Sequence, residues 1–319
     1  MESRNKVTLS CKELRRMGRE ALSGHWKSAA LGAAIFYIAL QLPLLILQLI
    51  FADKIGVRES ATTLYTLLMT GAFSYGFTLF VLTLYRTGKS EVDLVFAGFE
   101  KFFRTVALMF WETLFVCLWM GIFMIPAFIY IGSVNPGILL GQYDGGNPGS
   151  LGIFGVLLLI GVIVGIIASI KYSQCYYLAI DHPELTALGC IRASKAIIFG
   201  NKAKYFKMNL SFFGWLILGL LPMAIVTGVA QNYQFSPIQL FAMGILEFVL
   251  DIGFYYVAAY IMMTGTAFYE VLTGNVKAAT AETAEDTVRE ASSEMPAGST
   301  ETENRFGEGI EDEHGENRD

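Results

Sequence analysis

The stretch Leu151–Ile170 reads LGIFGVLLLIGVIVGIIASI and contains no charged side chain. About 20 apolar residues in a helix are enough to cross the roughly 30 Å hydrocarbon core of a membrane. Because backbone polar groups in lipid must be satisfied within the segment, such a stretch forms a helix rather than an open strand. It therefore predicts a membrane-spanning helix.

Five further apolar stretches share this character, so we expect an all-α fold, a polytopic membrane helix bundle with six transmembrane helices. Three of the five also lack charged residues, the third span in chain order carries only Glu112, and the last carries Glu247 and Asp251. The predicted spans are residues 29–51, 61–85, 106–131, 151–170, 208–230 and 237–268. A hydrophobic fraction of 54% is too high for an ordinary soluble domain.

Basic residues gather in the N-terminal segment and in the loops after the second and fourth spans. An excess of Lys and Arg marks the cytoplasmic side of a membrane, so both termini are predicted to be cytoplasmic in a multi-pass cell-membrane protein. Three parts follow, namely a basic amphipathic leader (1–28), a membrane domain (29–272) and an acidic tail (273–319). The tail is rich in Glu, Ser and Thr and poor in aromatic residues, which predicts disorder.

The cytoplasmic segments contain patterns of amphipathic helices. Ser10 and Glu13 form a capping box, and a second helix is predicted to begin at Asp181 and a third at Asp93. The basic residues of the first two helices are candidates for contact with anionic lipid headgroups at the inner face, Lys12, Arg15, Arg16, Arg19, Arg192 and Lys195. The alternative is that they only obey the charge rule and pad the bundle.

Acidic residues inside the predicted spans are candidates for an intramembrane polar site, because a charge near the bilayer centre is costly. Glu247 and Asp251 are four residues apart and share a helix face with Tyr255, while Glu112 lies in another span. Two adjacent carboxylates would suit a proton-linked transporter. The alternative is a structural role, with Glu247 at the outer interface and Glu112 close enough to the cytoplasmic boundary to meet Arg104 or Lys101.

Motifs for catalysis, nucleotide binding and metal binding are missing from the sequence, so we expect no enzyme activity, no cofactor, no metal and no nucleic-acid partner. The four cysteines show no CxxC spacing. The tail holds far more acids than bases and is a candidate for binding a protein partner or the basic inner face, or it is merely a solvated segment. The oligomeric state is left open.

Three stretches resemble a known family. They are ELRRMGREALSGHW (13–26), YLAIDHPELTA (177–187) and AFYE (267–270), supported by Tyr172-Ser173, Ser194-Lys195, Gly200-Asn201-Lys202 and residues 210–215. Together they resemble the bacterial (Firmicute-type) integral membrane family called domain of unknown function 975. The resemblance covers Glu13 to Leu272 with gaps. It implies a cell-membrane location and supplies no catalytic residues.

The sequence therefore favours a non-enzymatic module that binds lipids or a protein partner through its basic cytoplasmic face. A secondary transporter or channel for a small ion or solute, using Glu247 and Asp251, is the alternative. An intramembrane enzyme is the third and least favoured interpretation.

Overall fold

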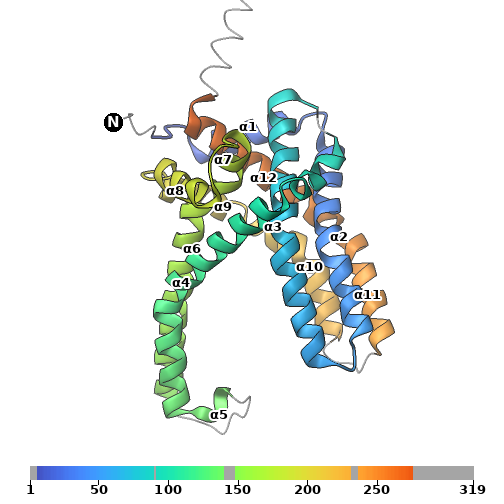
Figure 1. Ribbon diagram of the computed structural model, residues 1–319, viewed down its shortest axis with the longest axis vertical. Coiled ribbons are helices and arrows are strands. Elements are labelled where there is room, and N and C mark those ends of the chain that lie inside the picture. The colour runs from blue at the N-terminus through green and yellow to red at the C-terminus, as the bar shows by residue number, and fades with distance from the viewer. Residues whose placement is uncertain (1–5, 90, 140–147, 231–235, 276–319) are drawn as a thin grey trace, which may run out of the picture. The chain divides into compact units, whose positions relative to one another are not determined.

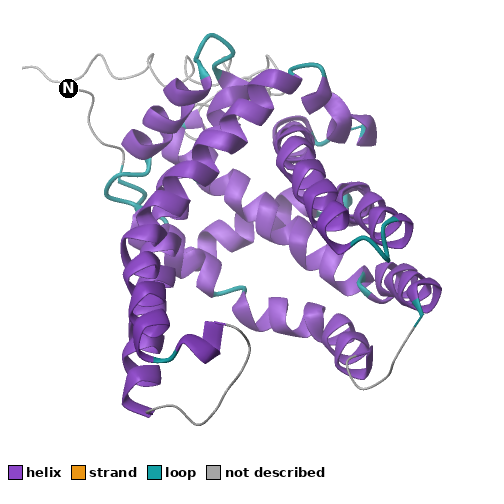
Figure 2. Ribbon diagram, turned by 60° about the horizontal axis from the view of Figure 1, so that its bottom comes forward, coloured by secondary structure: helices purple, strands orange, loops and turns teal. Residues whose placement is uncertain are grey.

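The computed structural model describes residues 6–89, 91–139, 148–230 and 236–275, and helices joined by loops make up these ranges (Figures 1 and 2). This confirms the predicted all-α fold; the acidic tail lies outside the described residues from position 276 onward. The elements in chain order are α1 (Cys11–Leu22), α2 (Trp26–Ile50), α3 (Ile55–Thr87), the 3₁₀ helix η1 (Val92–Phe99), α4 (Phe102–Val134), α5 (Pro136–Leu139), α6 (Pro148–Tyr172), α7 (Cys175–Asp181), α8 (Ala187–Ile197), α9 (Lys202–Leu210), α10 (Phe213–Ala230), α11 (Pro237–Leu250) and α12 (Ile252–Thr273).

Four described segments are long and apolar enough to cross a membrane, judged by length and composition. They are α2, α3, α4 and the stretch Gly149–Asp181, which contains most of α6 and all of α7. The pair formed by α11 and α12 makes a fifth candidate if it is one bent span. The described chain thus holds four or five candidate spans, against six predicted, and a shorter apolar helix, Phe213–Pro222, lies in α10.

The last predicted span is not one continuous helix. Helix α11 ends at Leu250, α12 begins at Ile252, and the two axes are bent by 56°. Asp251 stands at the junction, and Gly253 follows in the first turn of α12. Asp and Gly both have low helix propensity, so a break here costs less than in the aliphatic turns around it. The expectation of an unbroken helix over 237–268 is therefore wrong.

The predicted leader helix is present, and its apolar face packs against protein. Its capping box forms as expected, and the hydrogen bond from the Ser10 backbone N–H lowers the pKa of the Glu13 carboxyl. The cap is therefore intact at neutral pH and is lost as the pH falls through that lowered value. Leu14, Gly18 and Leu22 are buried, and Gly18 lies against Thr264 of α12. This apolar stripe is covered by the chain itself rather than by lipid.

The second predicted amphipathic helix begins later than expected. Asp181 is the last residue of α7, and α8 starts at Ala187 after a cap in which the Thr186 hydroxyl accepts a hydrogen bond from the Gly189 N–H. The expected start at Asp181 is therefore wrong, because Pro183 has no N–H to continue a helix and Thr186 supplies a better cap. The third predicted helix, from Asp93, appears as η1, which runs into α4.

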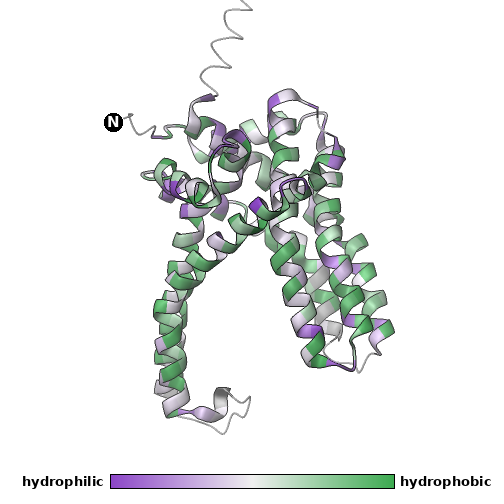
Figure 3. Cartoon of the chain, viewed as in Figure 1, coloured by the Kyte–Doolittle hydropathy of each residue, from purple (hydrophilic) through white to green (hydrophobic). Residues whose placement is uncertain are grey.

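Small residues allow the closest helix contacts. In α6, the GxxxG pair Gly161 and Gly165 faces Met124 and Met120 of α4, so the pattern serves internal packing between these two helices. The other faces of α4 and α6 carry exposed aliphatic side chains, including Ile125 and Leu159. Figure 3 shows that strongly hydrophobic residues dominate the length of this helix pair. An exposed apolar surface of this kind suits contact with lipid.

The C-terminal half of α3 is enclosed by α2, η1 and α12. Phe77, Phe80 and Leu84 are almost completely buried there. The backbone of η1 touches that of α3 at two glycines, since a Cβ at Gly76 would collide with the Val95 carbonyl and one at Gly98 with the Ala72 carbonyl. No flexible side chain lies there to move aside.

We therefore expect Gly76→Ala to lower the free energy of unfolding by about 1–3 kcal/mol, the usual cost of overpacking. Unfolding of the full chain in a mild detergent, followed by circular dichroism, measures this. Gly155→Ala in α6 is the matched control, because no atom lies within 4 Å of its added Cβ. Equal stability of the two variants would show that η1 does not press on α3 in this way.

Candidate functional site

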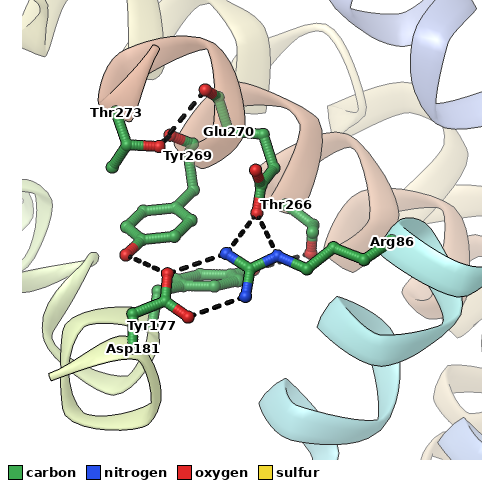
Figure 4. A network of polar contacts seen from close by, with 7 residues as sticks. All are labelled: Arg86, Tyr177, Asp181, Thr266, Tyr269, Glu270 and Thr273. Carbon is green, nitrogen blue, oxygen red and sulfur yellow. Dashed lines mark hydrogen bonds and ion pairs between the residues drawn. The ribbon is translucent and has the colours of Figure 1, made fainter. Parts of the chain in front are cut away.

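The strongest polar cluster lies where α3, α7 and α12 meet, and Arg86 is at its centre (Figure 4). Its Nη1 and Nη2 donate to the two carboxylate oxygens of Asp181, both at 2.7 Å. Its Nε donates to Glu270 Oε1, also at 2.7 Å, and Nη2 lies 2.6 Å from the same oxygen. One guanidinium therefore joins two carboxylates from different helices, and the bidentate pair with Asp181 fixes its plane.

Two tyrosines extend the cluster. The Tyr269 hydroxyl donates to Asp181 Oδ2 at 2.8 Å, and its ring stacks on Tyr177 with the centroids 4.8 Å apart. The Tyr177 hydroxyl lies 3.1 Å from Thr266 Oγ1, a contact buried between α7 and α12. The stacked rings and the hydrogen bonds therefore hold together two of the three helices that Arg86 joins, α7 and α12.

The local sequence explains how the three charged groups reach this place. Arg86 is in the last turn of α3, which ends at Gly88 in a left-handed conformation with φ 65°. Asp181 is the final residue of α7, and Glu270 lies in the last turn of α12. All three charged residues thus lie at or near the C-terminal ends of their helices, where these helices leave the apolar surroundings of the bundle.

The cluster is closed on its Glu270 side. The side chain of Glu270 is 5% exposed, that of Asp181 is 19% exposed and that of Arg86 is 36% exposed. The cluster carries two negative charges against one positive charge, so Arg86 is needed to stabilise both carboxylates. Because all three guanidinium nitrogens of Arg86 donate to carboxylate oxygens, the arrangement is suited to clamping the three helices together.

The predicted acidic pair lies at the bend between α11 and α12, apart from the Arg86 cluster in the chain and in its contacts. The Tyr255 N–H donates to the Asp251 carbonyl at 3.1 Å, and the Tyr255 hydroxyl donates to the Phe248 carbonyl at 3.3 Å. Asp251 Oδ1 is buried without a hydrogen-bond partner in the described structure. Glu247 lies in α11, before the break, and Tyr255 lies in α12, after it. The break therefore divides the helix face that Glu247, Asp251 and Tyr255 were predicted to share.

Glu112 has a different environment in α4. Its Oε2 accepts a hydrogen bond from the Cys175 thiol at 3.6 Å, and the ion pairs between described residues do not include it. Arg104, suggested as a partner from sequence, instead donates to the backbone carbonyls of His182 and Leu185. The structure therefore does not bring Glu112 together with a basic residue.

The six basic candidates for lipid contact lie on two helices, α1 and α8. Five of them are exposed and Arg15 is half-buried. The described ion pairs include only Arg16 among the six, through an exposed contact with Glu20 in the next turn. Their charges are thus available at the surface.

Sequence reasoning missed Arg86 as a site residue, because it looked like one of several basic residues in a loop. A signal was present for its partners, since Asp181, Tyr269 and Glu270 all belong to the stretches that carry the family resemblance. Among the described residues, His, Cys, Asp and Glu form no group of three that could hold a metal ion.

Comparison with known proteins identifies the family. A family profile described as "Protein of unknown function (DUF975)" matches residues 9–276, so the chain belongs to this family. No curated protein and no solved structure matches the chain. The matched region contains every described helix, from α1 to α12, and the Arg86 cluster.

Replacing Arg86 with Gln should lower the free energy of unfolding by about 1.5–3 kcal/mol, since two carboxylates would face each other without a counter-ion. Adding Glu270→Gln should recover part of this loss, because one negative charge disappears. The measurement is detergent unfolding of both variants alongside Arg58→Gln. Arg58 pairs with Glu59 in an exposed contact, which is worth little. A loss for Arg86→Gln no greater than that of Arg58→Gln would contradict the clamp.

Proposed function

We propose that this DUF975 protein is a multi-pass cell-membrane protein with six spans and cytoplasmic termini, and that it binds anionic lipid headgroups through its basic cytoplasmic helices. It acts as a non-enzymatic module. The observation that carries this proposal is the exposure of the basic residues on α1 and α8. The family description, protein of unknown function, neither favours nor opposes it.

The six-span arrangement rests on helix lengths together with the distribution of charge. The four clear candidate spans leave α10 and the α11–α12 pair to be assigned. Helix α10 has 18 residues, or about 27 Å of helix, which is close to the thickness of the hydrocarbon core. With α10 as the fifth span and the bent pair as the sixth, both termini lie on the side that carries the basic helices.

Lipid binding follows from where the charges sit on the helices. The apolar stripe of α1 packs against the rest of the protein, so Lys12, Arg16 and Arg19 lie on the exposed side of the helix. The helix does not have to insert into lipid to present them. Each Lys or Arg close to an anionic membrane surface contributes about 1 kcal/mol of attraction, and the attraction is screened by salt. Arg192 and Lys195 add a second exposed group on α8.

Neutralising five exposed residues (Lys12, Arg16, Arg19, Arg192 and Lys195, each to Gln) should reduce the enrichment of phosphatidylglycerol over phosphatidylcholine around the protein. Native mass spectrometry of nanodiscs with equal amounts of both lipids measures this enrichment. The control changes Lys54 and Arg58 to Gln. These residues lie at the N-terminal end of α3, away from Arg86, and their replacement should leave the phosphatidylglycerol enrichment intact. Unchanged enrichment in the five-residue variant would contradict the proposal, as would an equal loss in the control.

A second candidate function, transport of a small ion or solute, is favoured by the break at Asp251. Broken helices in transporters place backbone and side-chain groups at a binding site within the membrane. Here the break coincides with a buried carboxylate oxygen that lacks a partner in the described structure, and Glu247 lies one turn before it.

The transport hypothesis predicts cation or proton flux in proteoliposomes that the double substitution Glu247→Gln/Asp251→Asn abolishes. Flux is measured with a pH-sensitive dye and with ion-selective electrodes under imposed gradients. Glu184→Gln, an exposed acid outside the predicted spans, is the control and should preserve the flux. If the wild-type protein gives no flux above that of empty liposomes, the transport hypothesis is wrong and the lipid-binding proposal stands alone.

A further inference from the structure

A pocket of about 400 Å³ opens between α4, α6 and α9, and it is separate from both the Arg86 cluster and the Asp251 break. Its polar side is lined by Glu112 of α4, Ser169 of α6, Ser173 in the turn after α6, and Tyr205 and Asn209 of α9. Ile166 and Leu210, which are both exposed, line its apolar side. The pocket thus has one charged wall and one wall that continues onto an exposed apolar surface.

The carboxyl group of Glu112 has no ion-pair partner among the described residues. The only hydrogen bond recorded for its carboxylate within the described residues comes from the Cys175 thiol, a weak donor. Lys171 is the next residue after Ile170, which lines the pocket. Its Nζ, however, lies over the Trp119 ring, 4.1 Å from the centroid. A carboxyl group in an apolar setting either holds its proton or is stabilised as the carboxylate by a positively charged partner.

The other polar groups of the pocket present acceptors. The Ser169 hydroxyl donates its hydrogen to the Ile166 carbonyl at 2.9 Å. The Asn209 amide nitrogen donates to the Tyr205 carbonyl, also at 2.9 Å. The second N–H of the Asn209 amide remains as a donor. Three acceptors also remain, namely the carboxylate, the Ser169 oxygen and the Asn209 carbonyl oxygen. A ligand that satisfies all three must carry several N–H or O–H donors.

We infer that this pocket binds the primary ammonium group of an amphiphile. The ammonium, with three donors and a positive charge, is placed against Glu112 and the Ser169 and Asn209 oxygens, and the aliphatic chain leaves along Ile166 and Leu210. The combination of few polar groups and an apolar wall is typical of small-molecule sites. The ammonium can come from an aminophospholipid headgroup or from a free amphiphilic amine.

The first test is binding of dodecylamine to the full chain in a neutral detergent, measured by isothermal titration calorimetry. Saturable binding by the wild type is expected, with Glu112→Gln at least about tenfold weaker, since hydrogen bonds to a charged group are worth about 1.5–3 kcal/mol. Glu100→Gln removes an exposed acid that does not line the pocket and is the control, expected to bind like the wild type. Dodecyltrimethylammonium, which has no N–H donor, should bind more weakly than dodecylamine.

A second variant guards against a folding defect in Glu112→Gln. Ser169 is exposed, so Ser169→Leu fills the pocket from the surface while it leaves Glu112 in place. This variant should also weaken dodecylamine binding about tenfold or more. Binding that is absent from the wild type, or equal in the wild type and both pocket variants, would overturn the inference.

The two sources of the ammonium are separated in nanodiscs that contain phosphatidylethanolamine and phosphatidylcholine. Retention of phosphatidylethanolamine that Glu112→Gln loses would identify the lipid headgroup as the ligand. Equal retention by wild type and Glu112→Gln, together with lost dodecylamine binding in the variant, would identify a free amine. The basic residues of α1 and α8 are unchanged in these variants, so enrichment of phosphatidylglycerol should stay as in the wild type.

Discussion

The pairing of one guanidinium with two carboxylates at the end of α3 is the interaction on which the rest of the structure depends. Arg86 draws Asp181 and Glu270 to the same point, so α7 and α12 must both end beside α3. Helix α1 then packs along α12 through Leu14 and Gly18. A charged group that leaves an apolar bundle must find a partner, and here three helix ends satisfy one another.

The described helices form two regions, one packed around the Arg86 cluster and one with exposed apolar side chains. Around the Arg86 cluster the helices are packed on most sides, as the burial of Phe80 and Tyr269 shows. Toward the other ends of α4, α6 and α10 the side chains are mainly aliphatic and many are exposed, which fits helices that face lipid. The proposed lipid contacts on α1 and α8 belong to the packed region around the Arg86 cluster. The Asp251 break and the Glu112 pocket lie in helices that lead from this region to the exposed apolar one.

The sequence predicts the long apolar helices α2, α3, α4 and α6 because their signal is local. An uninterrupted apolar run such as Leu151–Ile170 needs no knowledge of its neighbours to be identified as a helix. The capping box at Ser10 and Glu13 is likewise set by residues three positions apart. The separation of α1 into a buried apolar stripe and an exposed basic face also follows from its pattern, although the pattern does not tell whether lipid or protein covers the stripe.

Features that depend on distant residues escape such an analysis. Arg86 meets Asp181 and Glu270, which lie 95 and 184 positions further along the chain, so no local pattern marks it. The break at Asp251 lies within an apolar run long enough to be a single helix, and only packing shows that it bends. Glu112 was identified as unusual from its type alone, but its partner, Cys175, and its pocket come from α6, α7 and α9 folding beside it.

We propose that the Arg86 end of α3 lies in the cytoplasm and that its Lys54 end lies outside, and labelling of single cysteines tests this orientation most directly. Cys11 and Cys117 are replaced by Ser, while Cys175 and Cys190 are buried and can stay. A cysteine at Lys54 should react with a membrane-impermeant maleimide in intact cells, and one at Lys89 only after permeabilisation. The reverse pattern, or labelling of both positions in intact cells, would contradict the orientation on which the proposed lipid binding rests.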